Sequence, residues 1–128
     1  MRDIDPDQCT HGGQGESQGL GLCWTQPAQA PVATLILAHG AGAPMDSPFM
    51  DDLAGRLAAC GIAVVRFEFA YMAARRSTGT RRPPDPQAQL LDRWRLVYAH
   101  VRQQVTGTLA VGGKSMGGRM ASLLADEL

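Results

Sequence analysis

The sequence lacks the features that would point to several large classes of protein. Twelve Lys and Arg residues are balanced by twelve Asp and Glu residues, so no net charge attracts nucleic acid or an anionic membrane surface. No run of eighteen apolar residues occurs, and Asp3, Asp5 and Asp7 stand where a secretion signal needs positive charge. We therefore expect a cytoplasmic protein with neither nucleic acid nor a membrane as partner.

Cysteine, lysine and histidine are also scarce. Cys9, Cys23 and Cys60 are odd in number and show no CxxC spacing, which fits neither a disulfide framework nor a zinc site. We expect reduced cysteines, no metal and no cofactor, with Cys60 as a small buried apolar residue rather than a reactive thiol. The one lysine, Lys114, is either a specific part of the motif described below or merely a neighbour that suits a helix.

The residues that are present predict one folded domain after a short tail. Of the 128 residues 45% are hydrophobic and 19% are charged, which is enough apolar content for a core. Residues 1–19 are rich in Gly, Gln and Asp and predict a flexible N-terminal tail. Residues 20–128 are predicted to form the domain.

Apolar runs interrupted by Gly and Pro predict alternating strands and helices. Strands are expected within residues 20–27, 32–38, 62–69 and 109–111, the last three buried. Helices are expected from Ser47 to Gly61, from Asp85 to Gly107 and after Ser115, with a loop over 70–84. Such crossovers form right-handed βαβ units, so we predict a three-layer α/β/α sandwich with a mostly parallel sheet.

The most specific motif is Gly113-Lys114-Ser115-Met116-Gly117, which lies between the last predicted strand and the last predicted helix. A Gly-x-Ser-x-Gly sequence at such a turn presents a nucleophilic serine, and its glycines relieve crowding on either side. Ser115 is thus the candidate nucleophile. The backbone N–H of Met116, at the start of the helix, is a candidate donor to an oxyanion.

A second motif, His39-Gly40-Ala41-Gly42, follows the first buried strand. Because chemistry collects at the carboxyl ends of strands in such sheets, we expect this loop to meet Ser115. It should supply a second N–H donor to the oxyanion. Ala41 is the preferred candidate for this donor, and Gly42 is the alternative. His39 and Gly40 are predicted to shape the loop, and His39 is expected to set the turn rather than to act as the base.

Three competing interpretations are less consistent with the sequence. A Gly-x-Ser-x-Gly pentad can occur by chance among fifteen glycines, but this one has the required position between strand and helix. A phosphate-binding loop needs Gly-Lys-Ser directly after four spacer residues, and Gly113 breaks that spacing. The arginines of residues 75–82 are predicted to lie in a solvated loop rather than to contact an anionic substrate.

Five segments together resemble one branch of a known superfamily. They are His39 to Ala43, Met45 to Met50, Arg66 to Met72, Arg81 to Pro84 and Gly112 to Met120. From about Val32 to its last residue the chain is similar to the dienelactone-hydrolase-like α/β hydrolases. That branch includes the hydrolase-like domains of a chromatin-complex subunit and of a testis-expressed relative. The resemblance implies an α/β-hydrolase fold, a partial one in this chain, with the His39 strand beside the Ser115 strand, and it implies no firm substrate.

Half of the expected catalytic machinery is missing from the sequence. Hydrolases of this fold place the acid and the histidine after the serine, yet no histidine follows His100. Asp126 and Glu127 would lie about 16 to 18 Å from Ser115 along a helix. We expect the front part of a longer hydrolase, truncated after the nucleophile helix. The competing expectation is a short native chain that self-associates through the exposed edge of its sheet.

These observations predict a serine hydrolase that acts on an ester, thioester or related acyl bond of a small molecule. Without a base a serine hydroxyl is a weak nucleophile, so very weak or no turnover is expected of this chain alone. The alternative is a non-catalytic hydrolase-like module that keeps the fold as a binding or interaction surface.

Overall fold

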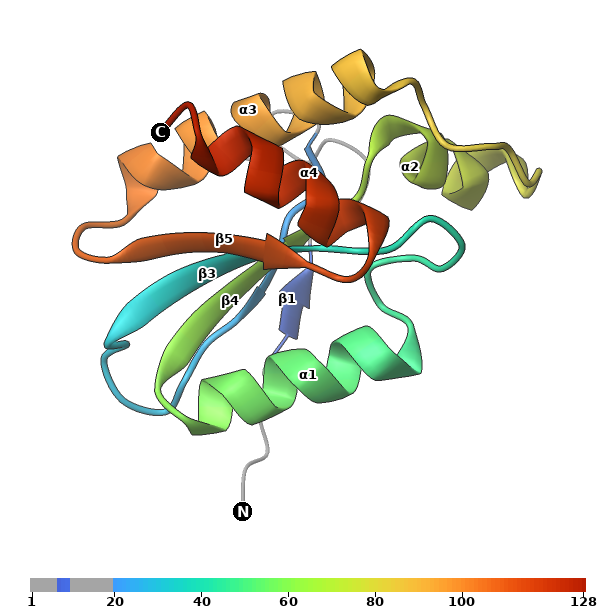
Figure 1. Cartoon of the computed structure of the whole chain (residues 1–128). Coiled ribbons are helices and arrows are strands. Elements are labelled where there is room, and N and C mark those ends of the chain that lie inside the picture. Colours follow the sequence, from blue (N-terminus) through green and yellow to red (C-terminus); the bar gives the residue numbers. More distant parts are fainter. Residues whose placement is uncertain (1–6, 10–19) are drawn as a thin grey trace.

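The computed structural model describes residues 7–9 and 20–128 and contains one five-stranded sheet in the order β1-β2-β4-β3-β5 (Figure 1). The strands are β1 (Asp7–Cys9), β2 (Cys23–Thr25), β3 (Ala33–Ala38), β4 (Ile62–Phe67) and β5 (Leu109–Gly113). β3 pairs in parallel with β4 and β5, whereas β1 and β2 continue the sheet in antiparallel orientation. The predicted strands are therefore confirmed, and the sheet is mixed.

Helices cover both faces of the sheet, which confirms the three-layer α/β/α architecture (Figure 1). They are α1 (Pro48–Ala59), α2 (Ala70–Thr78), α3 (Gln87–Gln104) and α4 (Met116–Ala125). α1 packs on one face through a small core that includes Met50 and Val64. On the opposite face α3 and α4 close a larger core that includes Trp94 and Leu124. The apolar stripes of the helices thus account for both layers.

The order of the strands decides which loops meet. Ile36 of β3 lies opposite Val65 on one side and Val111 on the other, so the strand before His39 is the direct neighbour of the strand before Ser115. This confirms the order that the resemblance implied. β5 is an edge strand in the part of the chain that the structure describes, and its side chains are only partly buried, so the prediction of a third buried strand is wrong.

The first helix follows its sequence signals closely. Ser47 is the N-cap of α1, and its hydroxyl accepts a hydrogen bond from the N–H of Met50 at 3.4 Å. Pro48 occupies the first helical position, where its missing N–H costs nothing. Gly61 follows the helix with φ of 91°, a left-handed conformation that suits glycine.

The predicted loop over residues 70–84 is wrong in its first half, because residues 70 to 78 form α2. The N–H of Tyr71 in the first turn donates to Oδ2 of Asp85 at 3.0 Å, so a carboxylate distant in sequence caps the helix. The following helix was predicted to begin at Asp85. That helix, α3, begins after Pro86 and has no side-chain cap.

Two predictions about cysteine are also wrong. Cys23 is disulfide-bonded, although the sequence predicted only reduced thiols. Cys60 is exposed rather than buried, because it lies at the end of α1 beyond the face that packs on the sheet. Of the predicted tail, residues 1–6 and 10–19 lie outside the described residues, while 7–9 form β1. No helix in residues 20–128 is long and apolar enough to cross a membrane.

Candidate active site

Ser115 lies on a sharp turn between β5 and α4. Its φ of 52° and ψ of −115° make it the one non-glycine residue with positive φ among the residues that the structure describes. Such a conformation costs about 1 to 3 kcal/mol and is typical of functional sites. The hydroxyl does not cap α4, although Ser115 occupies the N-cap position, so the helix does not engage the side chain that the turn presents.

Close backbone contacts explain the glycines around this turn. A β-carbon on Gly113 would lie 2.8 Å from the carbonyl carbon of Gly117 and 2.9 Å from the carbonyl oxygen of Ala38. A β-carbon on Gly117 would overlap with the carbonyl oxygen of His39. Only hydrogen fits at these positions, so α4 can start directly against the end of β3.

His39 is the first residue of the loop of residues 39 to 47, which connects β3 to α1. It is fully buried, its Nε2 accepts the N–H of Phe69 at 3.2 Å, and its Nδ1 lies 2.5 Å from the carbonyl oxygen of Gly40. An acceptor at Nε2 requires the neutral tautomer with its proton on Nδ1. Burial also lowers the pKa of His39 below the usual histidine value. Both ring nitrogens are therefore engaged by backbone groups, of Gly40 and of Phe69.

The 39–47 loop lies against the serine turn, and side chains hold its first peptides. A β-carbon on Gly40 would lie 3.7 Å from Cβ of Ser115, which shows how closely the two segments approach each other. The hydroxyl of Tyr71 donates to the carbonyl of Ala41 at 2.9 Å, and burial raises the pKa of this hydroxyl. In a trans peptide the N–H points opposite to the C=O. His39 thus orients the N–H of Ala41, and Tyr71 orients the N–H of Gly42.

These two N–H groups and that of Met116 donate to no protein acceptor within residues 20–128. Backbone donors that remain unpaired next to a serine can bind an anionic oxygen. The sequence named all three residues. It did not name Tyr71, whose place in α2 was hidden by the incorrect loop prediction.

Two buried charged residues hold the far end of the same loop and were also missed. Arg66 is fully buried and Glu68 is 3% exposed, and both contact the backbone of Met45. Their signal in the sequence was the alternation of charge along an otherwise apolar strand. Arg76, which was predicted to be solvated, forms ion pairs with Glu68 and Asp46.

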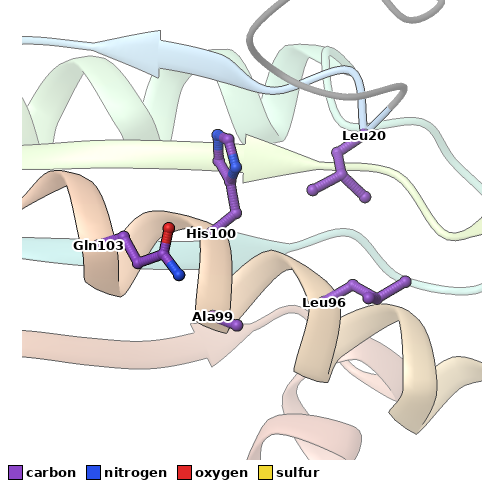
Figure 2. Close-up of a pocket in the computed structure, with 5 residues that line it drawn as sticks. All are labelled: Leu20, Leu96, Ala99, His100 and Gln103. Atoms are coloured by element: carbon purple, nitrogen blue, oxygen red, sulfur yellow. The ribbon is translucent and has the colours of Figure 1, made fainter.

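The other candidate residues do not meet Ser115. His100 lines a pocket of about 290 Å³ on α3, together with Leu20, Leu96, Ala99 and Gln103 (Figure 2). Glu127 lies beyond the far end of α4 and pairs with Arg95 at 2.7 Å. His11 lies outside the described residues. Within residues 20–128, no group of three or more His, Cys, Asp or Glu side chains could hold a metal ion.

Lys114 places its ammonium group over the ring of Phe49. Its Nζ lies 5.4 Å from the ring centroid of Phe49, which is about half exposed at the start of α1. The distance is that of a cation–π contact. Lys114 and Phe49 therefore form one side of the surface next to Ser115.

A model of the alpha/beta hydrolase domain matches residues 31–128, which is most of the chain. The chain belongs to the α/β hydrolase family. No curated protein is significantly similar to this chain in sequence.

Solved structures share its fold at low sequence identity. The dienelactone hydrolase of Anabaena variabilis is similar with a TM-score of 0.71 and 19% identity, over 96% of this chain and 59% of that chain. An alpha-beta serine hydrolase homologue from Coxiella burnetii gives 0.68 and 19%, over 99% and 60%. A carboxyl esterase from Bacillus coagulans gives 0.70 and 15%, over 95% and 40%. The chain spans between 40% and 60% of the length of these three structures.

Proposed function

We propose that the chain carries the nucleophile and the oxyanion-binding half of a serine hydrolase that cleaves an ester, thioester or related acyl bond of a small molecule. The observation that carries the proposal is the juxtaposition of Ser115, on its strained turn, with the unpaired N–H groups of Ala41, Gly42 and Met116. Family membership and the esterases among similar folds support the same reaction class.

In the proposed reaction, Oγ of Ser115 attacks the acyl carbon while a base accepts the hydroxyl proton. The negative charge develops on the former carbonyl oxygen, where Met116 and the 39–47 loop would donate hydrogen bonds. Collapse of this intermediate breaks the bond to the alcohol or thiol, which leaves with a proton. Water then releases the acyl group from Ser115 and regenerates the hydroxyl.

Active-site labelling tests the proposal. A fluorophosphonate should attach to Ser115, and the Ser115→Ala variant should remain unlabelled. Ser122→Ala is the matched control, because Ser122 is an exposed serine of α4 away from the strained turn. Labelling that persists in Ser115→Ala, or that disappears equally in Ser122→Ala, would contradict the assignment of the nucleophile.

The alternative of a non-catalytic binding module is favoured by one observation. His39 is the histidine of the loop that contacts Ser115, and both of its ring nitrogens are already engaged by the backbone. Within residues 20–128, no other histidine reaches the serine. A module of this kind would bind an acyl compound but would not release its alcohol or thiol in a Ser115-dependent manner. A product assay that compares the unmodified chain with Ser115→Ala distinguishes the two functions.

A further inference from the structure

Arg66, near the end of β4, and Glu68, which directly follows β4, both bind the backbone of Met45 in the 39–47 loop. Oε2 of Glu68 accepts the N–H of Met45 at 3.1 Å, and Nη1 of Arg66 donates to the carbonyl of Met45 at 2.9 Å. Residues two apart on an extended chain point to the same side, which explains how both reach one target. Met45 itself is 1% exposed, so the loop is fixed by its backbone inside the protein.

α2 contributes the group that holds Glu68 in place. Nε of Arg76 donates to Oε1 of Glu68 at 2.8 Å, and Nη2 donates to Oε2 at 2.7 Å. A bidentate contact of this kind fixes the plane of the carboxylate as well as its position. Nη2 also donates to Oδ1 of Asp46 at 2.7 Å, so Arg76 reaches the loop directly.

Burial makes this arrangement resistant to small shifts. A carboxylate that is 3% exposed is costly unless its charge and its lone pairs are satisfied, and Arg76 and Met45 satisfy them. Displacing the loop at Met45 would remove one of the two donors to Oε2 of Glu68 and would leave the N–H of Met45 without its acceptor. The loop is thus held at one end by His39 and Tyr71 and at the other by Glu68, with Ala41 and Gly42 between.

We propose that Glu68, oriented by Arg76, is a positioning residue for the oxyanion-binding N–H groups of Ala41 and Gly42. It touches no substrate and acts through the backbone of Met45. The inference rests on the proposed function of these N–H groups. Its structural part, the restraint of the loop by α2, is measurable without any reaction.

The first test is amide hydrogen exchange in the Arg76→Gln variant, which removes the bidentate partner of Glu68. Exchange at Met45 should become about tenfold faster than in the unmodified chain, because the variant lacks the charge-assisted contacts of Arg76 with Glu68 and Asp46 that oppose local opening. Arg95→Gln is the matched control. Arg95 also forms a bidentate contact, with Glu127 at 2.9 and 2.7 Å, but on the surface between α3 and the end of α4. Its variant should leave exchange at Met45 unchanged.

The second test is the rate of Ser115 labelling by a fluorophosphonate in the same two variants. Arg76→Gln should label about tenfold more slowly, and Arg76→Lys, which keeps the charge without the fork, should lie between. Circular dichroism should show that the Arg76 and Arg95 variants are folded. Slower labelling of Arg76→Gln alone is then not the result of a general loss of stability.

Unchanged exchange at Met45 in Arg76→Gln, or equal acceleration in Arg95→Gln, would overturn the proposal. Faster exchange with unchanged labelling would also overturn it, because the loop would then move without consequence for the serine. If the unmodified chain does not label at all, even with imidazole added as a base, the proposed function fails, and exchange at Met45 still decides whether Arg76 and Glu68 restrain the loop.

Discussion

The two halves of the candidate site are held in place by different forces. At the serine turn, backbone meets backbone so closely that β-carbons on Gly113 or Gly117 would collide with β3. In the 39–47 loop nothing lies within 4 Å of a β-carbon on Gly42, and the loop is instead held by hydrogen bonds from side chains such as His39 and Tyr71. One half depends on excluded volume and the other on polar contacts.

This difference predicts two kinds of response to change. Steric contact is insensitive to pH and fails abruptly when volume is added, because a packed interior cannot relax around a new atom. Hydrogen bonds from ionisable groups can be removed one at a time, and they depend on pH. Substitutions that add volume or remove a hydroxyl, and changes of protonation, should therefore affect the two halves of the site differently.

The largest effect is expected from Gly117→Ala. The added methyl group would press on the His39 carbonyl and would lie 2.8 Å from Cβ of Ala38, which should cost about 3 kcal/mol of unfolding free energy or prevent folding. Gly55→Ala is the control, since Gly55 has open space within α1 and alanine should stabilise that helix by about 1 kcal/mol. Urea unfolding of both variants measures the contrast, and similar stabilities would contradict the steric account of the turn.

Tyr71→Phe should have the next largest effect. Removing the hydroxyl leaves the carbonyl of Ala41 without its donor, which should cost about 1.5 kcal/mol. The Tyr98→Phe variant serves as control, because within residues 20–128 the hydroxyl of Tyr98 makes no hydrogen bond. Urea midpoints that shift equally in the two variants would show that Tyr71 does not hold the loop through its hydroxyl.

Ser115→Gly should raise stability, in contrast to the first two changes. Glycine adopts positive φ without strain, so the variant should be more stable than Ser115→Ala by about 1 kcal/mol. Both variants lack the hydroxyl, which leaves the backbone as the difference between them. Thermal unfolding measured side by side provides the test, and a less stable glycine variant would mean that the turn is not strained.

The loop should also weaken in mild acid. Because burial lowers the pKa of His39, the unfolded chain binds a proton at this residue more readily than the folded chain. The contribution of neutral His39 to the free energy of unfolding should be fully present above about pH 6.5, the pKa of histidine in the unfolded chain, and should decline as the pH falls below that value. His39→Gln should flatten this slope between pH 6.5 and 5. An unchanged slope in that variant would assign the pH dependence to other groups.

The smallest expected effect concerns the open edge of the sheet. We propose that β5 pairs with β5 of a second copy, because its outer edge has no partner strand in the described part of the chain. Ala110→Lys places a charge on the exposed face of this strand and should shift the mass measured by light scattering towards the monomer. A monomeric unmodified chain would contradict self-association.

Local signals explain which parts of the fold could be predicted. β3, α1 and the serine turn each carry their information within a few residues, as the Ser47 cap and the pentad around Ser115 illustrate. α2 was missed because a short helix is marginal on its own and its stabilising partners lie elsewhere in the chain. Asp85 caps it and Glu68 binds it, and neither contact can be read from spacing.

The candidate site divides in the same way. The sequence identified Ser115 and the N–H donors because glycine motifs mark them. It did not identify Glu68, because a polar residue at a strand exit gives no indication of which loop it will hold. It did not identify Tyr71, because the residues of α2 were predicted to form a loop. Burial of charge is a tertiary property, and here the buried charges of Arg66 and Glu68 hold the Met45 end of the loop.

Ser115 labelling by a fluorophosphonate, followed by intact mass with and without added imidazole, tests the central claim most directly. If the nucleophile and the oxyanion donors are assembled and only a base is lacking, labelling should be slow and accelerated by imidazole, which can accept the hydroxyl proton. The acceleration should vanish in Ser115→Ala. A folded chain that shows no Ser115-dependent labelling even with imidazole would contradict the account.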